Sequence, residues 1–108
     1  MTTFEDFIEA LKIELVEFAE YSWNTYKDAA IIDGKAFIEN SGTDLKRWTE
    51  MLARGDLTRD DFEWLMVGKK DLAELFALKQ KGLAKVALDR FVNGLIDTIV
   101  STAFKMFL

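Results

Sequence analysis

The chain has 108 residues, of which 50% are apolar and 31% are charged, and its net charge is -5. It contains nine Phe and three Trp but no His, Cys or Pro. This composition excludes a disordered chain, and it excludes chemistry that needs imidazole or thiolate groups, such as disulfides, Cys nucleophiles and His or Cys metal sites. We therefore expect one domain, residues 1–108, that is not an enzyme and has no catalytic residues, no cofactor and no metal.

Helical periodicity begins close to the start of the sequence. Apolar residues recur there at steps of three and four and form one stripe, at Phe4, Phe7, Ile8, Leu11, Leu15, Phe18, Tyr26 and Ala29. Thr3 and Asp6 form an approximate capping box before this stripe. The pattern predicts a helix over 4–32, which would be about 44 Å long at 1.5 Å per residue. Such a helix would project from a compact monomer, so an elongated or oligomeric protein is expected.

The middle of the chain is also helical in pattern. Asp33-Gly34 looks like a helix stop, but the period continues beyond it and predicts a helix over 35–54, with Asn40-Ser41-Gly42 as an alternative break. The clearest boundary is Gly55, which can close a helix in the left-handed conformation, followed by Thr58 and Asp61 as the cap of the next helix. The sequence leaves open whether helices continue through Gly34, Gly42, Gly68 and Gly82.

The last segment, 83–108, has a broad apolar stripe and a side with the small residues Gly94, Thr98 and Ser101. Small residues allow another helix to approach closely. No part of the chain shows the sustained alternation of a strand. The fold class is therefore all-α: an elongated helical bundle or a set of helical hairpins with a long N-terminal helix, expected to be oligomeric.

Charge is distributed unevenly along the sequence. Residues 1–30 carry seven acidic and two basic side chains, whereas residues 69–90 carry six basic and three acidic ones. We expect an acidic first helix beside a basic later helix. The alternative, a basic patch for nucleic acid, is disfavoured because the negative net charge opposes phosphate binding. No nucleic-acid partner is predicted.

The first and last helices have more apolar surface than one contact requires. Core packing explains this surface, and so does an interface with a partner. The residues predicted for interaction are Val16, Trp23, Leu95, Ile99, Val100, Phe104 and Phe107. Trp23 is the strongest of them because it lies off the main stripe, while Trp48 and Trp64 flank the Gly55 turn.

Two functions follow from this surface. The first is a non-enzymatic interaction or scaffolding protein, a homo-oligomer or a partner of another helical protein. The alternative is a peripheral membrane-binding or pore-forming protein that acts through the amphipathic segment 83–108, although that segment lacks the Lys/Arg-rich polar face of most interfacial helices. The chain opens with acidic residues where a secretory signal would be basic, so a cytoplasmic location is expected.

Overall fold

The computed structural model describes residues 3–77 and 84–108, and every regular element within these ranges is helical. The absence of strands from these ranges confirms the all-α prediction. The α-helices, in chain order, are α1 (Phe4–Ser22), α2 (Lys27–Asn40), α3 (Gly42–Arg54), α4 (Arg59–Val67), α5 (Lys70–Ala77) and α6 (Lys85–Phe107). A short 3-10 turn, η1 (Asn24–Tyr26), joins α1 to α2.

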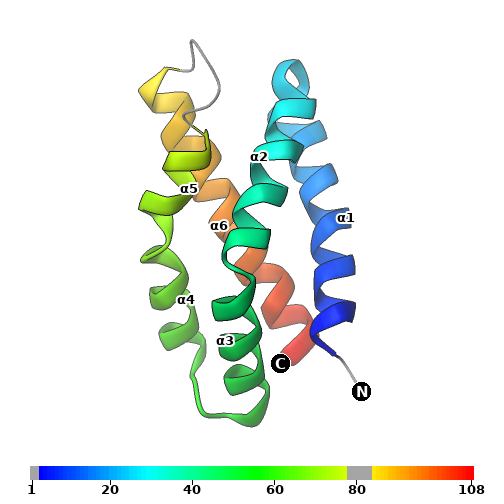
Figure 1. Ribbon diagram of the computed structural model, residues 1–108, viewed down its shortest axis with the longest axis vertical. Helices are drawn as coiled ribbons and strands as arrows, with labels where there is room; N and C mark the ends of the chain where they lie inside the picture. The colour runs from blue at the N-terminus through cyan, green and yellow to red at the C-terminus, as the bar shows by residue number, and fades with distance from the viewer. Residues whose placement is uncertain (1–2, 78–83) are drawn as a thin grey trace.

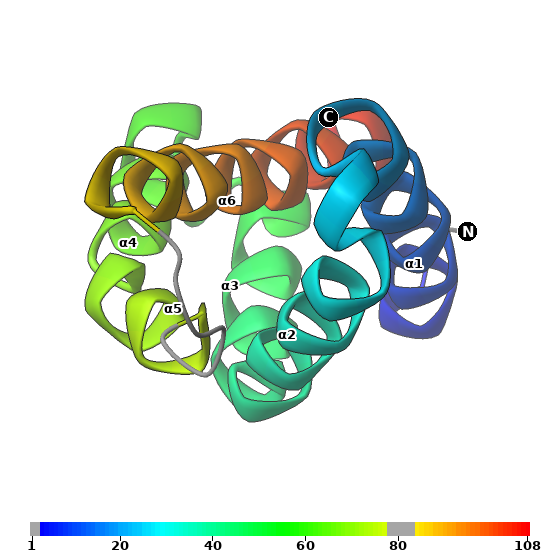
Figure 2. The same cartoon turned by 90° about the horizontal axis from the view of Figure 1, so that it is seen from above.

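The helices form four columns that run alternately up and down (Figure 1). Helix α1 is the first column, α2 and α3 form the second, α4 and α5 the third, and α6 the fourth. Seen from above, the columns surround a shared interior, and α6 lies between α1 and the α4–α5 column (Figure 2). The principal-axis extents are 42 × 23 × 19 Å, and the Cα radius of gyration is 13.5 Å.

The prediction of one helix over residues 4–32 is wrong, because the chain turns at Trp23. This residue leaves the helical conformation at φ -136° and ψ 39°, and its N–H donates to the carbonyl of Ala19. Its side chain is only 5% exposed and meets Phe91 of α6 edge-on, with ring centroids 5.6 Å apart. Burial of this large ring favours the turn, although no Gly or Pro marks it. The 19-residue α1 is about 28 Å long, so it does not project beyond the molecule.

The glycines of the middle segment differ in their roles. Gly34 lies inside α2, where a Cβ would stand 2.6 Å from Leu15 of α1, so its missing side chain lets the two helices approach closely. Residues 35–54 do not form the single predicted helix. The chain divides at Ser41 into α2 and α3, which agrees with the predicted alternative break at Asn40-Ser41-Gly42. Gly68 follows the end of α4. Gly82 lies outside the described residues.

Local signals at three helix ends are confirmed. Thr3 with Asp6 and Thr58 with Asp61 each form a complete capping box, and Gly55 has a positive φ of 82°. The helical part of the last segment is Lys85–Phe107. These helix ends could be predicted from the sequence because a cap depends on residues within one turn of each other.

All six α-helices contribute to one cluster of buried apolar side chains. The acidic α1 lies beside α6, and Arg90 of the basic region 69–90 lies near Phe18 and Trp23 at the end of α1, but no ion pair joins α1 to that region among the described residues. Glu14 of α1 pairs instead with Lys105 of α6 at 3.6 Å, and Glu20 pairs with Lys27 at 3.3 Å. Lys79 and Lys81 of the basic region lie outside the described residues.

Candidate interaction surface

The α3–α4 hairpin positions an exposed Trp64 beside Val67, which is also exposed. At its turn, the N–H of Asp56 donates to the carbonyl of Met51 at 2.8 Å, behind the left-handed Gly55. The N–H of Asp61 then donates to the Thr58 hydroxyl at 3.1 Å, and the Asp61 carboxylate accepts from the Thr58 N–H at 3.2 Å. These bonds define where α3 ends and where α4 begins, and thereby fix the faces that the two helices present.

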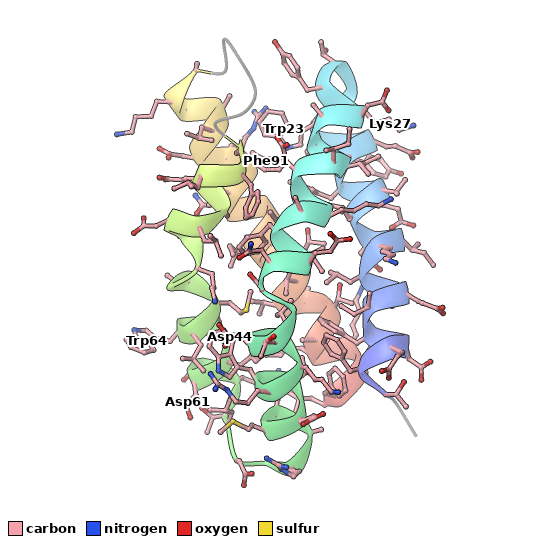
Figure 3. All side chains as sticks on the ribbon, in the orientation of Figure 1. Trp23, Lys27, Asp44, Asp61, Trp64 and Phe91 are labelled. Carbon is pink, nitrogen blue, oxygen red and sulfur yellow. The ribbon has the colours of Figure 1, made fainter. Side chains whose placement is uncertain are left out.

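Trp64 lies on the outer face of α4. Phe62 and Met66 are fully buried, and Trp64 is two residues away from each of them, which at 100° per residue places it on the opposite side of the helix. Its side chain is 75% exposed. Figure 3 shows it pointing away from the molecule. The register that buries Phe62 and Met66 therefore leaves this indole in solvent.

A hollow of about 450 Å³ lies beside Trp64, between α3 and α4. Its lining is mainly apolar or aromatic, with one acidic and one basic side chain at the edge. The lining residues are Asp44, Trp48, Trp64, Leu65, Val67, Gly68 and Lys69. We call this set the Trp64 surface. It combines an exposed ring with an adjacent depression on the same face.

The charged edge of the Trp64 surface is an ion pair. Lys69 Nζ lies 2.5 Å from Asp44 Oδ2, and the same ammonium lies 5.4 Å from the ring centroid of Trp48. Arg47 also contacts the Asp44 carboxylate, at 3.2 Å. The hydrogen bond from Lys69 is the main reason that the pKa of Asp44 is lowered, and it outweighs the opposing effect of desolvation. The surface thus presents both signs of charge beside its apolar part.

Four of the residues predicted for interaction lie in the chain's own core. Trp23, Leu95, Ile99 and Val100 are at most 7% exposed. Trp23 also lies beneath the guanidinium of Arg90, which is 5.0 Å from the ring centroid, and Figure 3 shows it next to Phe91. Packing within the chain accounts for these four side chains, so none of them offers an open surface.

The other three predicted residues are half-buried and do not form one face. Phe104 packs against Phe62 of α4, with ring centroids 6.0 Å apart, whereas Phe107 packs against Phe7 of α1 at 5.6 Å. Val16 lies on α1. The structure therefore places four of the predicted residues in the core, Phe104 and Phe107 in two different helix contacts, and Val16 apart from them on α1.

From the sequence, Trp23 was predicted to be a stronger interaction residue than Trp64. In the structure, Trp23 is buried and Trp64 is exposed. Trp23 is off the main stripe of α1 because it follows the last residue of that helix, not because it faces solvent. The signal for Trp64 was its spacing from Phe62 and Met66, which share the opposite face of α4. If α4 is taken as a separate short helix that begins at its own N-terminal cap, this spacing predicts that Trp64 faces away from the core.

Other kinds of site were also sought. Within residues 3–77 and 84–108, no three Asp or Glu side chains lie close enough together to hold a metal ion. No described helix is both long enough and apolar enough to cross a membrane. The chain is an all-helical protein, and comparison with protein-family models, curated proteins and solved structures found no match to it.

Proposed function

We propose that this chain is a non-enzymatic interaction protein that pairs with a second copy of itself through the Trp64 surface. The observation that carries the proposal is the indole of Trp64, which is 75% exposed beside a hollow of about 450 Å³. The four columns would then form an elongated bundle whose α3–α4 side contacts a partner. The sequence offers no imidazole or thiol for catalysis, which favours a binding role over an enzymatic one.

The kind of side chain supports this use of the surface. Trp is strongly enriched among the few residues that supply most of the binding energy of protein interfaces, and such residues fill pockets near the centre of the contact. Val67, which is 42% exposed, adds apolar area on the same helix. Trp48 and Leu65 are half-buried in the lining and form its apolar floor. An exposed ring next to an apolar depression is therefore suited to a protein contact.

A second copy is the partner that best matches this arrangement. In a two-fold symmetric dimer the same patch occurs on both subunits, so each protruding group must find its complement within that patch. The Trp64 surface contains a protruding ring and a hollow, and its edge contains the oppositely charged Asp44 and Lys69. The requirement in shape is thus met by one surface, and Asp44 and Lys69, which already pair within the chain, leave no unbalanced charge to oppose the contact.

Sedimentation equilibrium over micromolar concentrations tests the proposal. We expect the wild-type chain to dimerise and Trp64→Ala to weaken the dimer by about 1,000-fold, since the symmetric dimer contains this residue twice and each hot-spot residue contributes about 2 kcal/mol. Tyr21→Ala is the matched control, because Tyr21 is also aromatic and is 91% exposed but lies on α1. A monomeric wild-type chain contradicts dimerisation, and a Trp64→Ala dimer of unchanged affinity contradicts this surface.

The alternative proposal, a peripheral membrane or pore-forming role for the C-terminal helix, has less support. The apolar face of α6 packs into the core, where Leu95, Ile96 and Ile99 are at most 2% exposed. Insertion of that face into a bilayer would first require α6 to separate from α1 and α5. Flotation with anionic vesicles distinguishes the two: binding that persists in Trp64→Ala would favour the membrane role.

A further inference from the structure

A second hollow lies on a different part of the molecule, between α1 and the junction of α2 with α3. Its volume is about 360 Å³. It is lined by Phe4, Ile8, Lys12, Lys35, Ile38, Glu39 and Gly42. We call it the α1–α2 groove. It shares no lining residue with the Trp64 surface.

The floor of the α1–α2 groove is apolar. Phe4 and Ile8 are half-buried one turn apart on α1, and Ile38 of α2 is 5% exposed. Gly42 is one of the lining residues, and a Cβ at this position would have no atom within 4 Å. An ordinary side chain at the start of α3 would thus project into free space.

Two lysines from different helices accompany this apolar floor. Lys12 of α1 and Lys35 of α2 are exposed, and neither forms an ion pair or a hydrogen bond with another described residue. Glu39 is the only acidic residue among those that line the groove, so the lining carries a net positive charge. This local excess is notable because the first 30 residues contain only two basic side chains in all.

We propose that the α1–α2 groove binds a free medium-chain fatty carboxylate. The hydrocarbon chain lies on Phe4, Ile8 and Ile38, and the carboxylate is held by the ammonium groups of Lys12 and Lys35. Charge-assisted hydrogen bonds to a carboxylate satisfy these two cations, and the tail removes apolar surface from water. The volume is at the low end of small-molecule sites, which favours a single-chain ligand over a docked helix of about 10 Å diameter.

Decanoate, used below its micelle-forming concentration, is the probe for this proposal. We expect saturable binding by calorimetry, with amide shifts in a ¹H–¹⁵N spectrum centred on Ile8, Ile38 and Gly42. Decanol has the same tail without the charge and should bind at least about tenfold more weakly, a difference typical of a lost charge-assisted bond. Decyltrimethylammonium has the opposite charge, and acetate has no tail, so neither should produce this pattern.

Two variants test the head and the tail separately. Lys12→Gln with Lys35→Gln should weaken decanoate binding by about tenfold or more, whereas Lys46→Gln, which alters an exposed lysine outside the groove, should not. Gly42→Leu adds a bulky side chain to the lining and should weaken binding while the thermal melt stays cooperative, since a Cβ at this position meets no atom within 4 Å. Trp64→Ala should retain decanoate binding, which separates this proposal from dimerisation. Absence of saturable binding, equal binding of decanol, or equal affinities in the Lys12/Lys35 and Lys46 variants would overturn it.

Discussion

The contact of α1 with α6 and the α3–α4 side of the molecule use aromatic residues in opposite ways. Along α1 and α6, Phe7 packs against Phe107, Phe18 against Phe91, and Trp23 against Phe91, with ring centroids between 5.6 and 6.0 Å apart. We call these pairs the α1–α6 seam. On the Trp64 surface, the indole of Trp64 is 75% exposed and has no such ring partner in the described part of the chain. Aromatic side chains therefore stabilise the fold in one region and remain available for binding in the other.

The same contrast extends to how closely the backbones approach. Gly94 of α6 lies against the ring of Phe18, so the two helices approach closely there, although a hollow of about 330 Å³ opens beside this contact as one does beside Trp64. A closely packed contact tolerates little change in volume. Substitutions in the seam should therefore act mainly on stability, and those on the Trp64 surface mainly on association.

The largest expected effect is that of Phe7→Ala in the seam. Phe7 is fully buried and contacts the rings of Phe4 and Phe107. Its truncation removes apolar contacts and leaves a cavity, so the free energy of unfolding should fall by about 3–5 kcal/mol in urea titrations. Trp64→Ala is the comparison and should change it by at most about 0.5 kcal/mol at chain concentrations where the wild type is monomeric, so that dimerisation does not contribute. Equal losses in the two variants would contradict the division between the regions.

A matched pair of Gly→Ala substitutions should change the free energy of unfolding in opposite directions. A Cβ at Gly94 would stand 2.5 Å from Cε1 of Phe18, so Gly94→Ala forces that ring outward. Overpacking costs about 1–3 kcal/mol and the gain in helix propensity is about 1 kcal/mol, so a net loss of up to about 2 kcal/mol is expected. Gly42→Ala meets no atom within 4 Å and should stabilise the chain by up to about 1 kcal/mol.

Thermal and urea unfolding of these two glycine variants are the measurements. Stabilisation by Gly94→Ala would show that Phe18 moves without cost and that the seam is loosely packed. Destabilisation by Gly42→Ala would show that the α1–α2 groove is closed in solution. The pair thus compares a filled contact with an open one by the same chemical change.

Features that depend on neighbouring residues were predictable from the sequence. Helical periodicity gave the all-α class, and the caps at Thr3 and Thr58 and the turn at Gly55 were each identified from residues within one turn. The end of α1 was not predictable from the sequence, because the turn at Trp23 depends on burial against Phe91, which is distant in sequence. A local pattern holds no information about such a partner.

The candidate surface was less predictable than the fold. Apolar periodicity identifies residues such as Leu95 and Ile99 that face something apolar, but it does not distinguish a core from an interface. In this chain Leu95 and Ile99 are packed in the core. The Trp64 surface and the α1–α2 groove each combine residues from more than one helix, so their hollows appear only when the helices are placed side by side.

A smaller effect is expected at the cap that holds the α3–α4 hairpin. Thr58→Ala removes the hydroxyl that accepts from the Asp61 N–H, and it should lower the free energy of unfolding by about 1 kcal/mol. Thr43→Ala, an exposed position within the first turn of α3, is the control and should change it by less than about 0.5 kcal/mol. If Thr58→Ala and Thr43→Ala change the free energy of unfolding equally, the capping box at Thr58 does not stabilise the hairpin.

The smallest expected effect is the pH dependence of the Asp44–Lys69 pair. The pKa of Asp44 is lowered from its ordinary value of 3.8 in the folded chain, so the deprotonated carboxylate favours folding. This contribution is complete above the unfolded-state pKa and is lost as the pH falls through the folded-state pKa. Because both side chains are partly exposed, Asp44→Asn should lower the free energy of unfolding at pH 7 by about 0.5 kcal/mol, and the difference from wild type should disappear in acid well below 3.8.

Urea titrations at both pH values test this, with Asp71→Asn as the control because exposed Asp71 has no ion pair among the described residues. Lys69→Met should reproduce the loss at pH 7, since it removes the main cause of the lowered pKa. A difference between Asp44→Asn and wild type that persists undiminished in acid would assign the effect to packing. In that case the charged edge of the Trp64 surface would contribute to the fold in the same way as the seam, and the distinction between the two regions would be weaker.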